Sequence, residues 1–249
     1  MKLTLNTPSL LDTSSQALFI LVDAEQLKQI PATYKINDLD QIIATTQFKA
    51  SLNEVLPLIG KITQQTNSSL IGLDQATELS PAKLAKIAQT VIKASQKKFQ
   101  KISIDLSALP AELHYLFALS LTQAAYAFDE YKSKKNAFAL HSIELIAEHP
   151  CLTTEQLLLI EAVAQGQNLA RDLGNRPGNI CFPEYLAEQA RQLAAEFPDL
   201  LTVTVIDEQQ MADLGMHSFL AVSKGSDRPG RVITLEYKAH SDQAPVVLV

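Results

Sequence analysis

The chain has 249 residues, of which 47% are hydrophobic and 19% charged, an ordinary composition for a globular protein with one or two domains. Its 21 Lys and Arg residues face 27 Asp and Glu residues, and the resulting net charge of -6 disfavours general attraction to nucleic-acid phosphates. No apolar run reaches the roughly 18 residues of a membrane span, and the N-terminus lacks a signal-peptide pattern. We therefore expect a cytoplasmic protein without a membrane partner.

The first part of the chain alternates strand-like and helix-like segments. Ala17–Val22 is a short continuous apolar run, as expected of a strand buried on both faces, and Ser69–Leu73 resembles it. Ser80 can cap a helix whose first position suits Pro81. Apolar residues then fall on one face of that helix, namely Leu84, Ile87, Ala88, Val91 and Ala94.

The alternation continues with a strand over Lys101–Leu106, a second helix over about Ala111–Tyr131 and a strand over Ala137–Ala147. Strands separated by helices predict an α/β layer with a largely parallel sheet. We place this N-terminal α/β domain at residues 1–150.

A long helix is predicted next, over Thr154–Leu173. Thr153 and Gln156 can form a capping box at its start, and Gly174 or Asn175 can adopt the left-handed conformation that closes it. About twenty helical residues extend roughly 30 Å, so residues 151–176 are interpreted as a linker helix between two domains.

A new pattern begins after this break. Pro183 suits the first turn of a helix that Pro198 ends, and Leu201–Ile206 reads as a strand. Asp207 can cap a short helix that stops at Gly215. Further strands are predicted at Ser218–Val222, Arg231–Tyr237 and Ala244–Val249. Residues 177–249 are therefore interpreted as the opening part of a larger α/β domain.

Few residues of the sequence form a recognisable catalytic or binding motif. There is no glycine-rich phosphate loop and no serine nucleophile elbow. No pair of histidines has the spacing of a helical metal site, and a structural role is favoured for His141 and His217; the full set is His114, His141, His149, His217 and His240. Cys151 and Cys181 are interpreted as free thiols in a reducing compartment.

Three polar features have both a functional and a structural interpretation. Ser223–Arg231, between two predicted strands, is either a small anion nest of backbone amides or a polar loop. Arg171 and Asp172 can form a local ion pair near the end of the long helix, with weak support for an active-site role. Lys93–Lys101 and Tyr131–Asn136 are either basic patches or solvated surface, and the second interpretation is favoured.

The residues after the break carry a strong resemblance. NLARDLGNRPGNICFPEYLAEQARQLA (Asn168–Ala194), DEQQMADLGMHSFLAVSKGS (Asp207–Ser226), ITLEYKA and PVVLV follow one another in the order and spacing of the cytosolic leucyl aminopeptidases, the two-metal aminopeptidases of the PepA type. The first 150 residues resemble the family only in architecture. The resemblance implies a macrodomain-like N-terminal α/β domain, a long linker helix, and the first part of an α/β aminopeptidase catalytic domain.

The resemblance also implies a function. Members hydrolyse N-terminal residues from peptides with two divalent metal ions, Mn²⁺ or Zn²⁺, which activate a water and stabilise the tetrahedral intermediate. They assemble as homo-hexamers. The metal-binding and catalytic motifs of the family would begin after Val249, so no catalytic, cofactor-binding or metal-ligating residue is assigned in this sequence. The 249-residue chain by itself is therefore expected to be inactive and to bind no metal.

Two alternatives come from other functional classes. In the first, the chain is a non-catalytic DNA-binding module, since some bacterial members of the family bind DNA. In the second, it is a module that serves only in assembly. The net charge of -6 and the lack of a basic stripe count against DNA binding. We also expect an exposed, aggregation-prone apolar edge at Val246–Val249.

Overall fold

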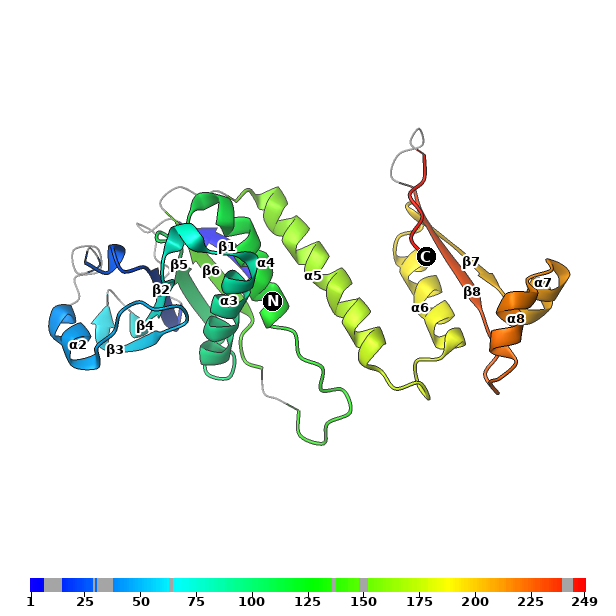
Figure 1. Cartoon of the computed structure of the whole chain (residues 1–249), viewed down its shortest axis with the longest axis horizontal. Coiled ribbons are helices and arrows are strands. Elements are labelled where there is room, and N and C mark those ends of the chain that lie inside the picture. The colour runs from blue at the N-terminus through cyan, green and yellow to red at the C-terminus, as the bar shows by residue number, and fades with distance from the viewer. Residues whose placement is uncertain are drawn as a thin grey trace. The chain divides into compact units, whose positions relative to one another are not determined.

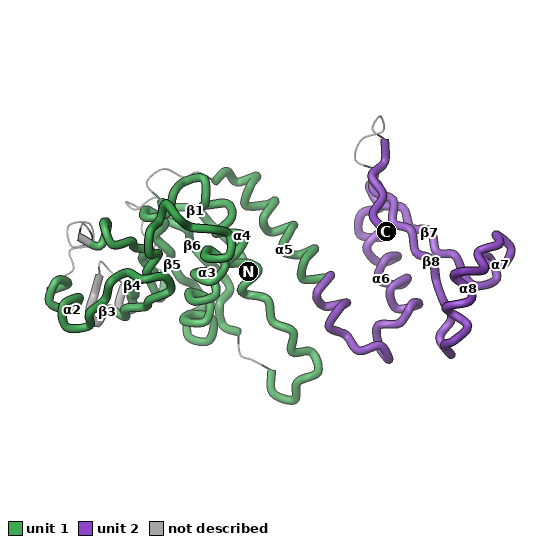
Figure 2. Tube along the Cα trace, in the orientation of Figure 1, with its two compact units in different colours: residues 1–169 green, residues 170–249 purple. Residues whose placement is uncertain are grey.

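The computed structural model describes residues 1–6, 15–28, 30, 38–62, 65–135, 138–147, 152–238 and 244–249. The chain divides into two compact units, Met1–Leu169 and Ala170–Val249, which are distinguished by colour in Figure 2.

Unit 1 is built on a six-stranded sheet with the strand order β1-β6-β5-β2-β4-β3. All neighbouring strands are parallel except β3 and β4. Helices α3 and α4 connect the central parallel strands (Figure 1). The elements are β1 (Lys2–Asn6), β2 (Ala17–Val22), η2 (Gln26–Lys28), α2 (Leu39–Thr46), β3 (Val55–Ile62), β4 (Gln65–Gly72), η3 (Ala76–Glu78), α3 (Pro81–Ser95), β5 (Lys101–Asp105), η4 (Ala111–Leu113), α4 (His114–Ala124), β6 (Ser142–Ile146) and the first part of α5 (Thr154–Asn175).

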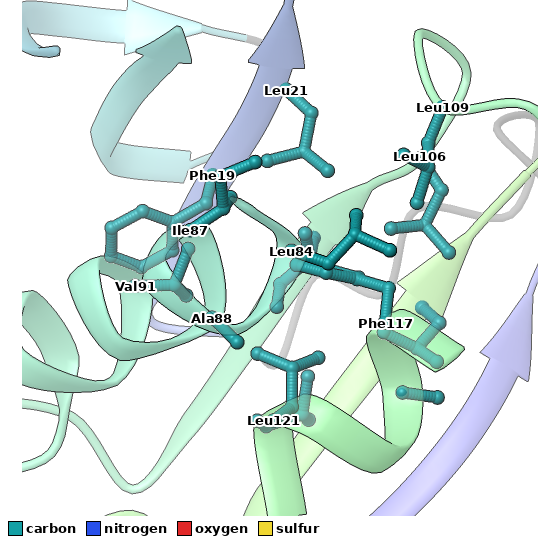
Figure 3. Close-up of a cluster of buried hydrophobic side chains, with 14 of the residues drawn as sticks. Phe19, Leu21, Leu84, Ile87, Ala88, Val91, Leu106, Leu109, Phe117 and Leu121 are labelled. Carbon is teal, nitrogen blue, oxygen red and sulfur yellow. The ribbon is translucent and has the colours of Figure 1, made fainter. Parts of the chain in front are cut away.

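Strand β2 lies inside the sheet and is buried on both faces, as its apolar run predicts. Phe19 and Leu21 belong to a core shared with α3 and α4, which Figure 3 shows around Leu84 and Phe117. The alternate residues of the strand belong to a second core on the other face, with Leu39 of α2. Since successive side chains of a strand point to opposite faces, a strand between two cores requires apolar residues throughout.

Helix α3 confirms the predicted start and the predicted apolar face. The Ser80 hydroxyl accepts a hydrogen bond from the Lys83 amide at 3.3 Å, and Pro81 is the first helical residue. Leu84, Ile87, Ala88 and Val91 are fully buried. Capping and packing therefore both favour a helix at this position.

Two predicted elements of unit 1 have wrong bounds. The second helix ends at Ala124 and not near Tyr131, because the buried stripe ends there and Tyr131 is 50% exposed. Strand β6 begins at Ser142, whereas a start at Ala137 was predicted, a residue outside the described ones. The backbone just before it is held instead by the end of α3, since the Ala139 amide donates to the Gln96 carbonyl.

The sequence patterns missed strands β1 and β3 and helix α2 of unit 1. Strand β1 pairs with β6, about 140 residues further along the chain, and β3 pairs with β4 at the edge of the sheet. Helix α2 shares the second core with β3, through Leu39 and the strand residues Leu56 and Leu58. Strand β1 is stabilised by pairing with a strand that is remote in sequence, so its own residues give little indication that it forms a strand.

Helix α5 confirms the predicted capping box. The Gln156 amide donates to the Thr153 hydroxyl at 3.1 Å, and the Gln156 side chain accepts from the Thr153 amide at 2.9 Å. The predicted left-handed closure is wrong, because the helix continues through Asn175 and Gly215 is the one described glycine with positive φ. Pro177 follows, and a proline cannot continue the hydrogen-bond ladder.

Unit 2 contains the rest of α5, α6 and a two-stranded antiparallel sheet, with the elements α6 (Pro183–Glu196), β7 (Leu201–Ile206), α7 (Glu208–Asp213), α8 (His217–Ser223) and β8 (Val232–Tyr237). The predicted strand at Leu201–Ile206 is confirmed with the same bounds. Asp207 forms a full capping box with Gln210 at the start of α7, as its position predicts.

The prediction of a strand over Ser218–Val222 is wrong, because these residues lie in α8. A short apolar run fits a buried strand or a helix equally well. Leu220 is buried here, whereas Phe219 and Val222 are 57% and 82% exposed. The run therefore does not lie inside a sheet.

The prediction of a strand over Ala244–Val249 is also wrong. These residues form no strand and pair with neither β7 nor β8. A strand is stable only beside another strand, and this segment lacks one among the described residues. The expected exposure of the apolar edge is confirmed, since each side chain of Val246–Val249 is at least 75% exposed.

Candidate functional site

The best-defined polar arrangement of unit 2 joins the start of α6 to the start of β8. The Arg231 Nε donates to one Glu184 carboxylate oxygen at 2.6 Å, and an Arg191 guanidinium nitrogen donates to the other at 3.0 Å. We call these three residues the α6–β8 clasp. Glu184 lies in the first turn of α6, where a carboxylate also interacts favourably with the helix dipole.

A second carboxylate holds the loop Ser223–Arg231. Glu208 of α7 accepts the Gly230 amide at 2.9 Å. Hydrogen bonds from the Ser223 hydroxyl and the Gly230 amide lower the pKa of Glu208. The Gly230 amide of this loop therefore binds a carboxylate of the same unit. The prediction that the loop joins two strands is wrong, because it joins helix α8 to strand β8.

The loop also borders an apolar groove of about 620 Å³. Phe219, Val222 and Met211 supply its apolar wall, with Arg228 and Arg231 at its polar side. The Arg228 guanidinium lies over the Phe182 ring at 4.3 Å. Since the lining described by the structure contains no His, Cys, Asp or Glu, the groove can form a binding surface but supplies no general base.

The α6–β8 clasp makes the stability of unit 2 depend on pH. Hydrogen bonds from Arg191 and then Arg231 lower the pKa of Glu184 below its ordinary value. A carboxylate with a lowered folded-state pKa stabilises the fold above its unfolded pKa, near 4.3, and that contribution disappears as pH falls through the folded value.

We expect Glu184→Gln to lower the unfolding midpoint of unit 2 by a constant amount from pH 7 down to about pH 5. The difference from the wild-type chain should then shrink below about pH 4. Urea unfolding across this range, followed by circular dichroism, measures it. Glu196→Gln, at the exposed end of the same helix, is the control and should not change the profile. A difference that persists unchanged at pH 3 would contradict the role of the Glu184 charge.

The described histidines do not gather at a site. His114 is 5% exposed, and its Nε2 lies 3.0 Å from the Leu109 carbonyl oxygen, as in a hydrogen-bonded core histidine. His141 is exposed just before β6, and His217 is exposed as the first residue of α8. His149 and His240 lie outside the described residues.

The remaining sequence candidates lie on helices and loops of the two units. Arg171 and Asp172 are half-exposed on α5, and both interact with other groups. Cys181 is a free, half-buried thiol as predicted, and Cys151 is outside the described residues. Lys93, Lys97 and Lys98 at the end of α3, and Lys132, Lys134 and Lys135 of the other basic stretch, are exposed.

The described residues do not fit the two divalent ions that the resemblance implies. No group of three or more His, Cys, Asp and Glu side chains among them is placed to hold a metal ion. We therefore derive no catalytic step through a metal from these residues.

In the described part of the chain, no helix combines the length and the apolarity needed to cross a membrane.

Sequence reasoning missed the residues that organise unit 2. Glu184 and Glu208 follow Pro183 and Asp207 directly, so an acidic residue in the first turn of each helix was the available signal. That signal indicates a favourable helix start and does not identify a partner at Gly230 or Arg231, more than twenty residues away.

The fold is that of a two-unit α/β protein, and the sheet of its larger unit is dominated by parallel strands. The chain belongs to the cytosol aminopeptidase family. Residues 21–135 match the model of the family's N-terminal domain, and residues 168–249 match the model of its catalytic domain.

Curated relatives match most or all of the chain. A probable cytosol aminopeptidase of Acinetobacter baumannii is 63% identical over 249 residues, and that of Acinetobacter baylyi is 61% identical. One from Pseudomonas aeruginosa is 38% identical over 191 residues, which are 72% of this chain and 38% of the relative. The chain spans 52% of the length of the Acinetobacter relatives.

Solved structures show the same fold at low sequence identity. A tomato leucine aminopeptidase variant superimposes with a TM-score of 0.81 at 19% identity, covering 98% of this chain and 52% of that one. The bottromycin maturation enzyme BotP in complex with Mn superimposes with a TM-score of 0.69 at 21% identity, covering 89% and 45%. Residues 1–249 therefore have the fold of the corresponding part of a leucine aminopeptidase.

Proposed function

We propose that residues 1–249 form part of a leucyl-type aminopeptidase that removes N-terminal residues from peptides. The observation that carries the proposal is the 63% identity to a probable cytosol aminopeptidase over all 249 residues. Proteins that are this similar over two structural units, and over the helix that they share, are expected to catalyse the same reaction.

The proposal includes two divalent metal ions, with Mn²⁺ or Zn²⁺ as the expected occupants. Its support is family membership and the Mn named for BotP. Such ions supply Lewis-acid activation of a water and of the scissile carbonyl. Because the described residues offer no ligand set, the metal ligands would be contributed by residues beyond those described.

The domain organisation belongs to the same proposal: an N-terminal domain at residues 1–150, a linker helix at 151–176 and the start of a catalytic domain at 177–249. Homo-hexameric assembly and a cytoplasmic location are proposed from the family, and the relatives' name as cytosol aminopeptidases supports the location.

DNA binding is the alternative function. Duplex binding that is lost when salt is added would support it, whereas the net charge of -6 opposes it.

A chimera tests the function directly. Residues 1–249 are joined to the part of the Acinetobacter baumannii relative that follows the position aligned with Val249. We expect the chimera to hydrolyse L-leucine amide when Mn²⁺ is added and to lose this activity with a chelator. The 249-residue chain in the same assay should show no hydrolysis, because no metal-ligand set is assembled among its described residues.

The relative itself is the positive control, and circular dichroism and size-exclusion chromatography establish that the chimera is folded. A folded chimera without activity would contradict the proposal that residues 1–249 serve this chemistry. Hydrolysis by the 249-residue chain at the rate of the chimera would contradict its predicted inactivity.

A further inference from the structure

Unit 1 contains a cavity of about 520 Å³ that the proposed chemistry does not use. Its walls come from the start of β1, the last turn of α4, residues 138–140 and one face of α5. The volume falls within the range of about 300–1,000 Å³ typical of small-molecule sites. All of the lining residues lie within unit 1.

The α5 wall carries three polar side chains in register. Glu161, Gln165 and Asn168 are four and three residues apart, so they lie along one face of the helix. One Glu161 carboxylate oxygen accepts the Leu3 amide at 3.4 Å. Among the described residues the second oxygen has no hydrogen-bond donor, which leaves it for a ligand.

The α4 wall strengthens the preference for a cation. Thr122 and Ala125 line the cavity from the last turn and the C-terminal cap of α4. The C-terminus of a helix carries a partial negative charge from its unpaired carbonyl groups. With Glu161 in the same lining, two elements of the fold favour a positive group in this cavity.

Apolar residues form the remaining wall. Leu140 is buried at 2% exposure, and Phe138 is half-buried beside it. They are held in place because the backbone amides of Ala139 and Leu140 donate to the Gln96 carbonyl at the end of α3. An apolar group of a ligand would therefore meet a wall that the fold has already positioned.

We propose that this cavity binds an α-amine with an adjacent carbonyl and an apolar side chain, as found in a free amino acid or in the N-terminal residue of a peptide. The ammonium group pairs with Glu161, the Gln165 and Asn168 carboxamides donate to the carbonyl, and the apolar group packs on Phe138 and Leu140. The site is a binding site with no catalytic residue, and it does not rest on the proposed aminopeptidase activity.

Met1, with its N-terminal amino group, and Lys2 also line the cavity, so an anion is the competing ligand. Three probes of one shape separate the two possibilities: isoamylamine, isoamyl alcohol and isovalerate carry a positive, a neutral and a negative head group. Binding to the 249-residue chain is followed by NMR chemical shifts at neutral pH, without added metal. We expect saturable shifts with isoamylamine and none with the alcohol or the acid.

The decisive variant is Glu161→Gln, whose side-chain oxygen still accepts the Leu3 amide while the charge is removed. We expect L-leucine amide to bind this variant about tenfold more weakly or worse, because the variant lacks the negative charge that pairs with the ammonium group. Glu155→Gln, in the first turn of the same helix and outside the cavity lining, is the matched control and should bind as the wild-type chain does.

L-leucine and leucyl-glycyl-glycine then distinguish a free amino acid from a peptide end, and saturable binding of either supports the proposal. Equal affinity of the wild-type chain and Glu161→Gln, preferential binding of isovalerate, or no saturable binding of any amine below about 10 mM would overturn it. Circular dichroism of the variant establishes that a loss of binding is not a loss of fold. Since binding is measured without turnover, its failure leaves the chimera assay of the proposed function unaffected.

Discussion

Replacing Leu84 by alanine is expected to destabilise unit 1 by about 2–5 kcal/mol, which is among the largest effects of any single substitution in this chain. Leu84 is fully buried in α3, between the sheet and α4, in the core shown in Figure 3. The substitution removes the side chain's transfer free energy and leaves a cavity that the surrounding leucines and phenylalanines cannot fill. Urea denaturation followed by circular dichroism at 222 nm measures the change.

Leu158→Ala is the matched control. Leu158 is also a helical leucine of unit 1, but it is 62% exposed on α5, so we expect a change within about 0.5 kcal/mol. Similar losses for the two substitutions would contradict the placement of α3 in the core. A second unfolding transition, unchanged in both variants, would be assigned to unit 2.

Gly72→Ala should destabilise unit 1 by about 3 kcal/mol or more, because the backbone passes too close for a side chain. A Cβ at Gly72 would overlap the Ser51 carbonyl oxygen and lie 2.5 Å from the Ala50 carbonyl carbon. Both obstructions are backbone atoms, so no rotamer change relieves them. The same loop is held by hydrogen bonds from the Gly72 amide to Glu54 and from the Asn53 amide to Gly72.

Gly166→Ala is the opposite case within the same unit. Gly166 lies inside α5 with nothing within 4 Å of an added Cβ. Alanine is favoured over glycine in a helix by about 0.5–1 kcal/mol, so this substitution should stabilise the chain. The urea unfolding midpoints of both variants measure these changes. An unchanged midpoint for Gly72→Ala would mean that the Ala50–Ser51 segment does not cross closely over β4.

The candidate sites were less predictable than the elements that carry them. Gln165 and Asn168 lie on a helix that the sequence predicts, but their cavity is completed by Phe138 and Leu140 from a different part of the chain. Likewise, Arg231 was predicted to lie at the edge of a polar loop, and its partner Glu184 is 47 residues earlier. A pairing across such a distance leaves no pattern in either local stretch.

Local signals were decisive where a few neighbouring residues hold their own backbone. Ser80, Thr153 and Asp207 each cap the helix that follows them, and the apolar run Ala17–Val22 is a strand with the predicted bounds. Capping bonds and hydrophobic periodicity act within four residues, so contiguous sequence is enough to determine them. The resemblance of Asn168–Ala194 and Asp207–Ser226 likewise determined the family from sequence alone.

Tertiary structure decided the rest. Lys2–Asn6 is a strand because β6 lies beside it, and Ala244–Val249, although richer in β-branched residues, is not, since it has no strand beside it among the described residues. Ser218–Val222 is helical for a related reason: one of its apolar residues is buried and the others face solvent. Strand pairing and cavity formation are interactions between distant segments, and the free energy of such interactions depends on partners that no local window of sequence contains.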